Sequence, residues 1–189
     1  MRTNWILENL KTSRYPLPNE VGGYDYLINV SDEYILQVHD VCLSKGIKYF
    51  WFPTTEFGDM GINSIVGALQ ILSIAHKEDA KVLVHCHAGA NRSRLIKDCY
   101  YYIATGEHIV YEKTKLYENL FPGCEDKCER NSLLRNLNLG NLPIQIITLL
   151  DSLREKFKKQ EHDCAYNTSI DLDSIKIDIG ITNINELKN

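Results

Sequence analysis

The sequence has no hydrophobic run long enough to cross a bilayer, no excess of basic residues and no internal repeat. A transmembrane helix needs about 20 consecutive apolar residues, and a secretory signal needs a hydrophobic stretch near its start. We therefore expect neither of these segments. The formal net charge is −4, which disfavours nucleic acid and anionic membranes as partners. With 189 residues, the chain is long enough for one domain with a sizeable core.

The six cysteines follow no regular spacing that would indicate a disulfide framework. Cys124 and Cys128, together with His108, are the best metal candidate in the sequence. Three residues separate the two cysteines and no second pair accompanies them, so the spacing is not that of a usual zinc site. We therefore predict free thiols, no metal and no cofactor, and a reducing, cytoplasmic location.

One segment, residues 82–93, combines features that a chemical site requires. Residues 82–84 are apolar and lead to Cys86, and five small or polar residues separate Cys86 from Arg92. A buried strand, a tight loop and the start of a helix would produce this order. The N–H groups of the loop and the positive end of the helix would then converge on one point. Such an arrangement binds an anion of phosphate size.

Each side chain of this segment suits a phosphate site. Cys86 is the predicted nucleophile, because a helix N-terminus with nearby cations favours the reactive thiolate. Arg92 offers a planar fork that can bind two phosphoryl oxygens. Ser93 can donate its hydroxyl to the sulfur, and Gly89 permits backbone angles that a side chain would forbid. His85 is expected to fix the loop rather than to carry protons. The other predicted phosphate-binding residues are His87, Ala88, Ala90 and Asn91.

The string His-Cys-x5-Arg-Ser at residues 85–93 resembles the signature of the cysteine-dependent protein tyrosine phosphatases, especially their small dual-specificity branch. The resemblance extends loosely over residues 4–157. It implies an α/β fold with a central, mostly parallel sheet flanked by helices. It also implies that Cys86 attacks phosphorus while Arg92 and loop amides hold the oxygens, and that water then hydrolyses the phosphocysteine. No metal is required.

The resemblance further implies a general acid on a loop upstream of the cysteine. Residues 53–59 occupy that place and contain two carboxylates. Asp59 has the residue type usual in the family and follows the flexible Gly58, which suits a loop that closes over substrate. Glu56 lies nearer to the end of the preceding strand. We favour Asp59 as the catalytic acid; either carboxylate could instead cap the helix expected from Ile62.

Hydrophobic patterning elsewhere predicts alternating strands and helices. Strands are expected at residues 4–7, 26–30, 48–52 and 81–85. Helices are expected from a cap at residues 31–32 to residue 46, and at residues 62–76, 92–106, 111–117 and 143–157. A strand, helix and strand at this spacing form a βαβ unit with parallel strands. The phosphate site would then lie at the carboxyl end of a central strand, where open α/β sheets place their ligands.

We predict a phosphatase domain at residues 1–160 and a C-terminal extension at residues 161–189, which is either an edge strand or a flexible tail. The predicted substrate is phosphotyrosine in proteins, with phosphoserine and phosphothreonine as further targets. Two alternatives stay open. The chain could be a phosphoinositide or RNA 5′-phosphatase with the same loop, or a catalytically weak phosphate-binding module. The phosphorylated substrate is the expected partner. The oligomeric state is left open, with a monomer among the possibilities.

Overall fold

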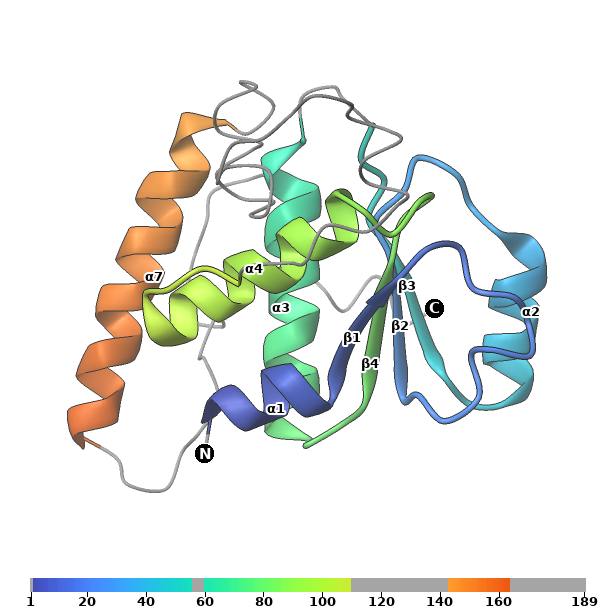
Figure 1. Cartoon of the computed structure of the whole chain (residues 1–189), viewed down its shortest axis with the longest axis horizontal. Coiled ribbons are helices and arrows are strands. Elements are labelled where there is room, and N and C mark those ends of the chain that lie inside the picture. The colour runs from blue at the N-terminus through green and yellow to red at the C-terminus, as the bar shows by residue number, and fades with distance from the viewer. Residues whose placement is uncertain (1, 56–59, 110–142, 164–189) are drawn as a thin grey trace.

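The computed structural model describes residues 2–55, 60–109 and 143–163. In this part of the chain, four parallel strands form one sheet in the order β1-β4-β2-β3 (Figure 1). The strands are β1 (Leu10–Ser13), β2 (Tyr26–Asn29), β3 (Lys48–Trp51) and β4 (Val82–His85). The predicted α/β class with a parallel sheet is confirmed, and β4 is an inner strand.

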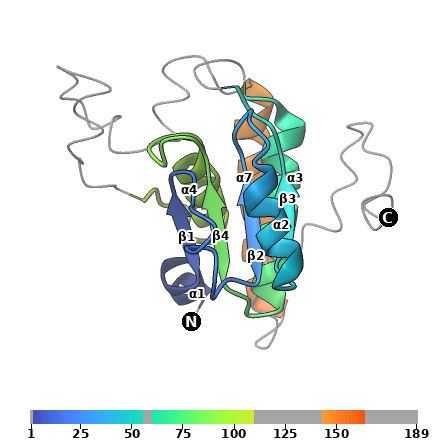
Figure 2. The same cartoon turned by 90° about the vertical axis from the view of Figure 1, so that its right-hand side faces the viewer.

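Helices cover both faces of the sheet. They are α1 (Arg2–Glu8), α2 (Leu36–Ser44), α3 (Ile62–Lys77), α4 (Arg92–Thr105) and α7 (Ile144–Asp163). Of these described helices, α2 lies on one face, and α1, α3, α4 and α7 lie on the other (Figure 1). Figure 2, turned by 90°, shows α2 in front of the strands that it covers. None of the described helices is long and apolar enough to span a bilayer.

The two faces of the sheet contribute to two separate hydrophobic clusters. Successive strand residues point to opposite faces, so Ile28 and Val84 pack with α1, α3, α4 and α7, whereas Leu27 and Leu83 pack with α2. All four of these side chains are buried. Burial on both faces explains why β2 and β4 are apolar in consecutive positions rather than alternating with polar residues.

The strand predicted at residues 4–7 is wrong, because these residues belong to helix α1. A short apolar run does not distinguish a strand from a buried turn of helix by periodicity alone. In the structure Trp5 and Ile6 are buried in the larger cluster, and the Trp5 indole N–H donates to the carbonyl of Ala80 over 3.0 Å. The place beside β4 is taken instead by β1, in which Leu10 lies opposite Val82.

The cap predicted at residues 31–32 is also wrong, because α2 begins at Leu36. The two polar side chains have other partners. The Ser31 hydroxyl donates to the Asn29 side-chain oxygen over 2.7 Å. The Asp32 carboxylate accepts a hydrogen bond from Arg92, which lies sixty residues further along the chain. A tertiary contact has thus replaced a local capping interaction.

The other predicted strands and helices within the described ranges begin within a residue of their expected start. Helix α7 is held against α4 by Arg154, which donates to the Ile103 carbonyl over 3.1 Å. It continues to Asp163, and the boundary predicted at residue 160 stays a prediction. The helix predicted at residues 111–117, the cysteine pair at 124 and 128, and residues 164–189 lie outside the described residues.

Candidate functional site

The loop that joins β4 to α4, residues 86–91, curls around the sulfur of Cys86; we call it the cysteine loop. The Gly89 N–H donates to Cys86 Sγ over 3.3 Å, and Ser93 Oγ lies 3.4 Å from the same sulfur. Residue Cys86 is buried, as is Ser93. The sulfur thus has two polar neighbours, although Cys86 also belongs to the larger hydrophobic cluster.

The cysteine loop is fixed to the segment that follows β1. The Cys86 N–H donates to the carbonyl of Ser13 over 3.3 Å, and the Tyr15 N–H donates to the carbonyl of His87 over 3.1 Å. These backbone hydrogen bonds hold the loop from one side. They extend the pairing of β1 with β4 past the end of both strands.

Gly89 is the residue on which this close approach depends. Its φ is +69°, a region that L side chains rarely adopt. A Cβ atom at this position would lie 2.4 Å from the backbone nitrogen of Arg14 and 2.6 Å from the carbonyl carbon of Ser13. Both atoms belong to the backbone and cannot rotate away. The predicted need for glycine in the loop therefore has a steric cause as well as a conformational one.

Arg92, the first residue of α4, is almost fully buried, with a relative exposure of 1%. Its Nη1 donates to an Asp32 carboxylate oxygen over 3.0 Å and to the carbonyl of Thr54 over 2.7 Å. The hydrogen bond from Arg92 holds the pKa of Asp32 below its usual value. Asp32 is thus a charged partner that fixes the guanidinium in place.

Sequence reasoning missed Asp32 and Thr54 as members of the site. Asp32 follows β2 and Thr54 follows β3, and β2 pairs with both β3 and β4. The carboxyl ends of parallel strands meet at one edge of a sheet. A polar residue just past each of these strands could therefore have indicated a site residue. This inference requires knowing that the strands are neighbours.

Two other cysteines are chemically different from Cys86. Cys42 and Cys99 are buried and form no disulfide. Burial raises the pKa of both thiols, so the reactive thiolate is disfavoured in each. Both side chains belong to the hydrophobic clusters of the core, and we regard them as core residues.

His85 precedes Cys86, the predicted nucleophile, and has no exposed surface. Burial lowers its pKa from 6.5 to about 4, so the imidazole is neutral at neutral pH. Its ring also lies 5.9 Å from that of Tyr15, in an edge-to-face arrangement. A neutral, enclosed imidazole agrees with the predicted role of fixing the loop.

We expect His85 to make stability depend on pH. Between about pH 6.5 and 4 the unfolded state binds a proton that the folded state does not, so stability falls as the pH falls through this window. When the pH is lowered from about 7 to about 5, this group should lower the free energy of unfolding by roughly 2 kcal/mol. Urea unfolding of wild type and His85→Asn at both pH values measures the difference. Equal losses in the two proteins would contradict this account.

The remaining predicted loop residues differ in exposure. His87 is exposed and Ala88 is half-buried, whereas Ala90 and Asn91 are buried. The two candidate acids, Glu56 and Asp59, lie outside the described residues, so the choice between them stays a prediction. In the described ranges, no three histidine, cysteine or acidic residues lie together as a possible metal site.

Comparison with known proteins agrees with this geometry. No family model matches the chain. A segment of 63 residues, 33% of the chain, is 32% identical to mouse "Protein tyrosine phosphatase domain-containing protein 1", and the bovine protein of that name is 30% identical over 63 residues. The match spans only 8% of the length of either protein.

Several solved structures share the fold at low sequence identity. Tk-PTP in its active form has a TM-score of 0.51 at 19% identity, covering 80% of this chain and 95% of Tk-PTP. DUSP15 has a TM-score of 0.51 at 16% identity, covering 87% and 96%. The catalytic domain of the PP-IP phosphatase SIW14 from S. cerevisiae has a TM-score of 0.50 at 14% identity, covering 82% and 88%. The chain therefore has the fold of the cysteine-based protein tyrosine and dual-specificity phosphatase-like superfamily, which it also resembles in sequence, and the resemblance predicted from residues 85–93 is confirmed.

Proposed function

We propose that the chain is a cysteine-dependent phosphatase that hydrolyses phosphate monoesters in proteins, phosphotyrosine above all and phosphoserine or phosphothreonine besides. One observation carries the proposal. The Cys86 sulfur lies at the N-terminal end of α4 with the Gly89 N–H and the Ser93 hydroxyl directed to it. Such donors stabilise a sulfur anion, and the helix dipole favours negative charge at this end. The same features attract a phosphate dianion.

The proposed reaction has two steps. In the first, a lone pair of the Cys86 thiolate forms a bond to phosphorus while the bond from phosphorus to the leaving oxygen breaks. That oxygen takes a proton from the general acid, Asp59 or Glu56. In the second, water attacks the phosphocysteine, its proton returns to the same carboxylate, and the sulfur–phosphorus bond breaks. The Ser93 hydroxyl stabilises the thiolate that leaves. Positioning and charge stabilisation dominate such transfers.

Arg92 has a defined part in this scheme. Its Nη1 is bound by Asp32 and Thr54, which sets the plane of the guanidinium. A fixed plane is what bidentate binding of two phosphoryl oxygens requires. Because Asp32 is itself an anion beside this group, a phosphate must either share the guanidinium with it or displace it.

Fold similarity alone does not select the substrate. The structures that share the fold include Tk-PTP and a protein that is named a PP-IP phosphatase. A phosphatase of polyphosphorylated small molecules, of phosphoinositides or of RNA 5′ ends is therefore the second candidate, and a weak phosphate-binding module is the third. A reducing, cytoplasmic location belongs to the proposal, because the mechanism needs a free Cys86 thiol.

The experiment that tests the proposal measures hydrolysis of phenyl phosphate, in the presence of a chelator, by wild type, Asp59→Asn and Glu56→Gln across a range of pH. Wild type should be active. The variant that lacks the true acid should lose about 10²–10⁴-fold in turnover and should show a flatter basic limb of the pH profile. We expect this variant to be Asp59→Asn, with Glu56→Gln as its matched control. An inactive wild type would contradict the proposed function, and two fully active variants would contradict the acid loop.

A further inference from the structure

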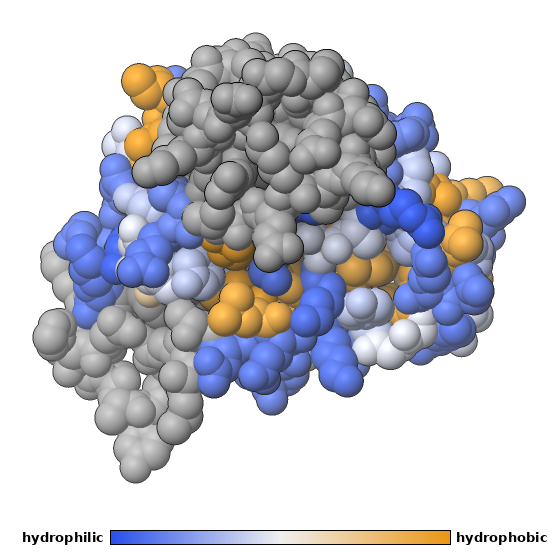
Figure 3. Space-filling model, viewed as in Figure 1, coloured by the Kyte–Doolittle hydropathy of each residue, from blue (hydrophilic) through white to orange (hydrophobic). Residues whose placement is uncertain are grey.

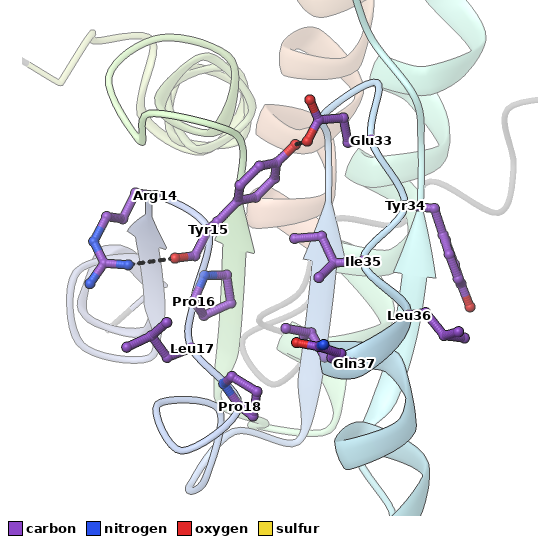
Figure 4. A pocket seen from close by; sticks show the side chains of 11 residues that line it. Arg14, Tyr15, Pro16, Leu17, Pro18, Glu33, Tyr34, Ile35, Leu36 and Gln37 are labelled. Carbon is purple, nitrogen blue, oxygen red and sulfur yellow. Dashed lines mark hydrogen bonds between the residues drawn. The ribbon is translucent and has the colours of Figure 1, made fainter.

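A pocket of about 630 Å³ lies beside the cysteine loop and has no part in the mechanism above. It is formed by the segment that follows β1 and by the residues that lead into α2 (Figure 4). Pro16 and Leu17 come from the first of these segments, and Ile35 and Leu36 from the second. Ligand pockets in proteins have about 300–1,000 Å³, so the volume suits a side chain or a small group.

The walls of this pocket are largely apolar and open to solvent. Leu17 and Leu36 are exposed by 52% and 61%, which is high for leucine in a folded domain. In the same lining, Pro16 is buried and Ile35 is half-buried. Figure 3 shows hydrophobic areas on the side of α2, and also at the centre and the upper left of the view, set among hydrophilic residues. Exposed apolar groups that gather around a hollow commonly mark a binding site.

The pocket is continuous with the cysteine loop through Tyr15. The Tyr15 ring lines the pocket, and its centroid lies 4.7 Å from that of His87 in the loop. The Tyr15 hydroxyl donates to the Glu33 carboxylate over 2.8 Å (Figure 4), which fixes the Tyr15 ring between the pocket and the loop. A ligand whose phosphate occupies the cysteine loop would therefore extend past Tyr15 into the pocket.

The charges around the pocket oppose a polyanionic ligand. Among the described residues that line it, Arg14 is the one cationic side chain, and Arg14 already pairs with Glu20 over 3.3 Å. Glu33 lines the pocket as an anion, and the charged Asp32 precedes it in the chain. A compound carrying several phosphates would bring its further charges toward these carboxylates, at an electrostatic cost. An apolar group would meet no such opposition.

We propose that this pocket binds an apolar side chain of a phosphorylated peptide, next to the phosphorylated residue whose phosphate occupies the cysteine loop. The inference rests on the proposed function and narrows its substrate to peptides with apolar residues near the phosphate. Apolar contacts would come from Leu17, Ile35 and Leu36, and Tyr15 would separate the two subsites. Burial of the exposed leucines by the peptide supplies the binding free energy.

The test compares two phosphotyrosine peptides that differ only in having leucine or aspartate at the positions flanking the phosphotyrosine. Wild type should prefer the leucine peptide by roughly tenfold in kcat/KM, the factor expected from burying about half of a leucine side chain. Leu17→Asp and Leu36→Asp should each remove most of this preference while leaving phenyl phosphate kinetics unchanged. Because both leucines are exposed, neither variant should unfold the protein.

Leu43→Asp is the matched control, because Leu43 is 64% exposed on the same helix α2 but does not line the pocket. It should keep the preference for the leucine peptide. If wild type hydrolyses phenyl phosphate but has equal kcat/KM for the two peptides, the inference is overturned and the proposed function stands. Equal losses in Leu17→Asp and Leu43→Asp would overturn it as well. A wild type inactive on phenyl phosphate would instead refute the proposed function.

Discussion

Replacement of Cys86 by serine is expected to lower the turnover of phenyl phosphate by at least about 10⁴-fold, as removal of a catalytic nucleophile generally does. The serine hydroxyl is a far weaker nucleophile than a thiolate, and the chain offers it no adjacent base in the described site. The donors directed at Cys86 Sγ stabilise an anion, which a serine would not supply at neutral pH. Steady-state kinetics on the purified variant measures the loss.

Two controls separate chemistry from folding in this experiment. Cys86→Ser should still bind vanadate, because the Gly89 N–H, Arg92 and the end of α4 remain in place. Cys42→Ser removes another buried thiol, on the opposite face of the sheet. The folded molecules of this variant should have the turnover of wild type. An active Cys86→Ser variant would show that another group attacks phosphorus.

The second large effect is expected at Arg92. Arg92→Lys should lower kcat by about 10²–10³-fold, the range typical of removing a donor that stabilises transition-state charge. An ammonium group presents its donors from one atom and cannot reproduce a planar fork. It would also have to satisfy Asp32 and Thr54, which now bind Nη1 of the guanidinium. Affinity for vanadate should fall together with kcat, because both depend on the same geometry.

Arg94→Lys is the control for this substitution, because Arg94 belongs to the same first turns of α4 and is half-buried rather than buried. We expect its kinetics to stay close to those of wild type. Thermal unfolding of both variants shows whether a loss of activity reflects a loss of structure. Full activity in Arg92→Lys, or an equal loss in Arg94→Lys, would contradict the role assigned to the guanidinium.

The part of the site that lies within one stretch of sequence was predictable from that stretch. Residues 82–84 are apolar, the loop after Cys86 is small and polar, and Gly106 closes the following helix in a left-handed conformation. Taken together, and not singly, these features predict a strand, an anion-binding loop and a helix. The structure contains these elements at the expected residues.

The parts that depend on contacts between distant segments were not predictable in this way. Asp32 has the residue type and position of a helix cap, and only the pairing of β2 with β4 brings it to Arg92. The run at residues 4–7 is too short for its periodicity to separate helix from strand. Its outcome depends on distant contacts of Trp5, which is buried in the larger cluster and donates its indole N–H to the Ala80 carbonyl. The same limit applies to the pocket beside Tyr15, whose two walls come from separate segments.

The central claim is that the Cys86 sulfur becomes bonded to phosphorus during turnover. It is tested most directly by quenching the enzyme in acid during hydrolysis of a phosphotyrosine peptide, digesting it, and locating the bound phosphoryl group by mass spectrometry. We predict a phosphoryl group on the Cys86 sulfur. A phosphoryl group on His87 or Ser93, or turnover with no phosphorylated enzyme at all, would contradict the account.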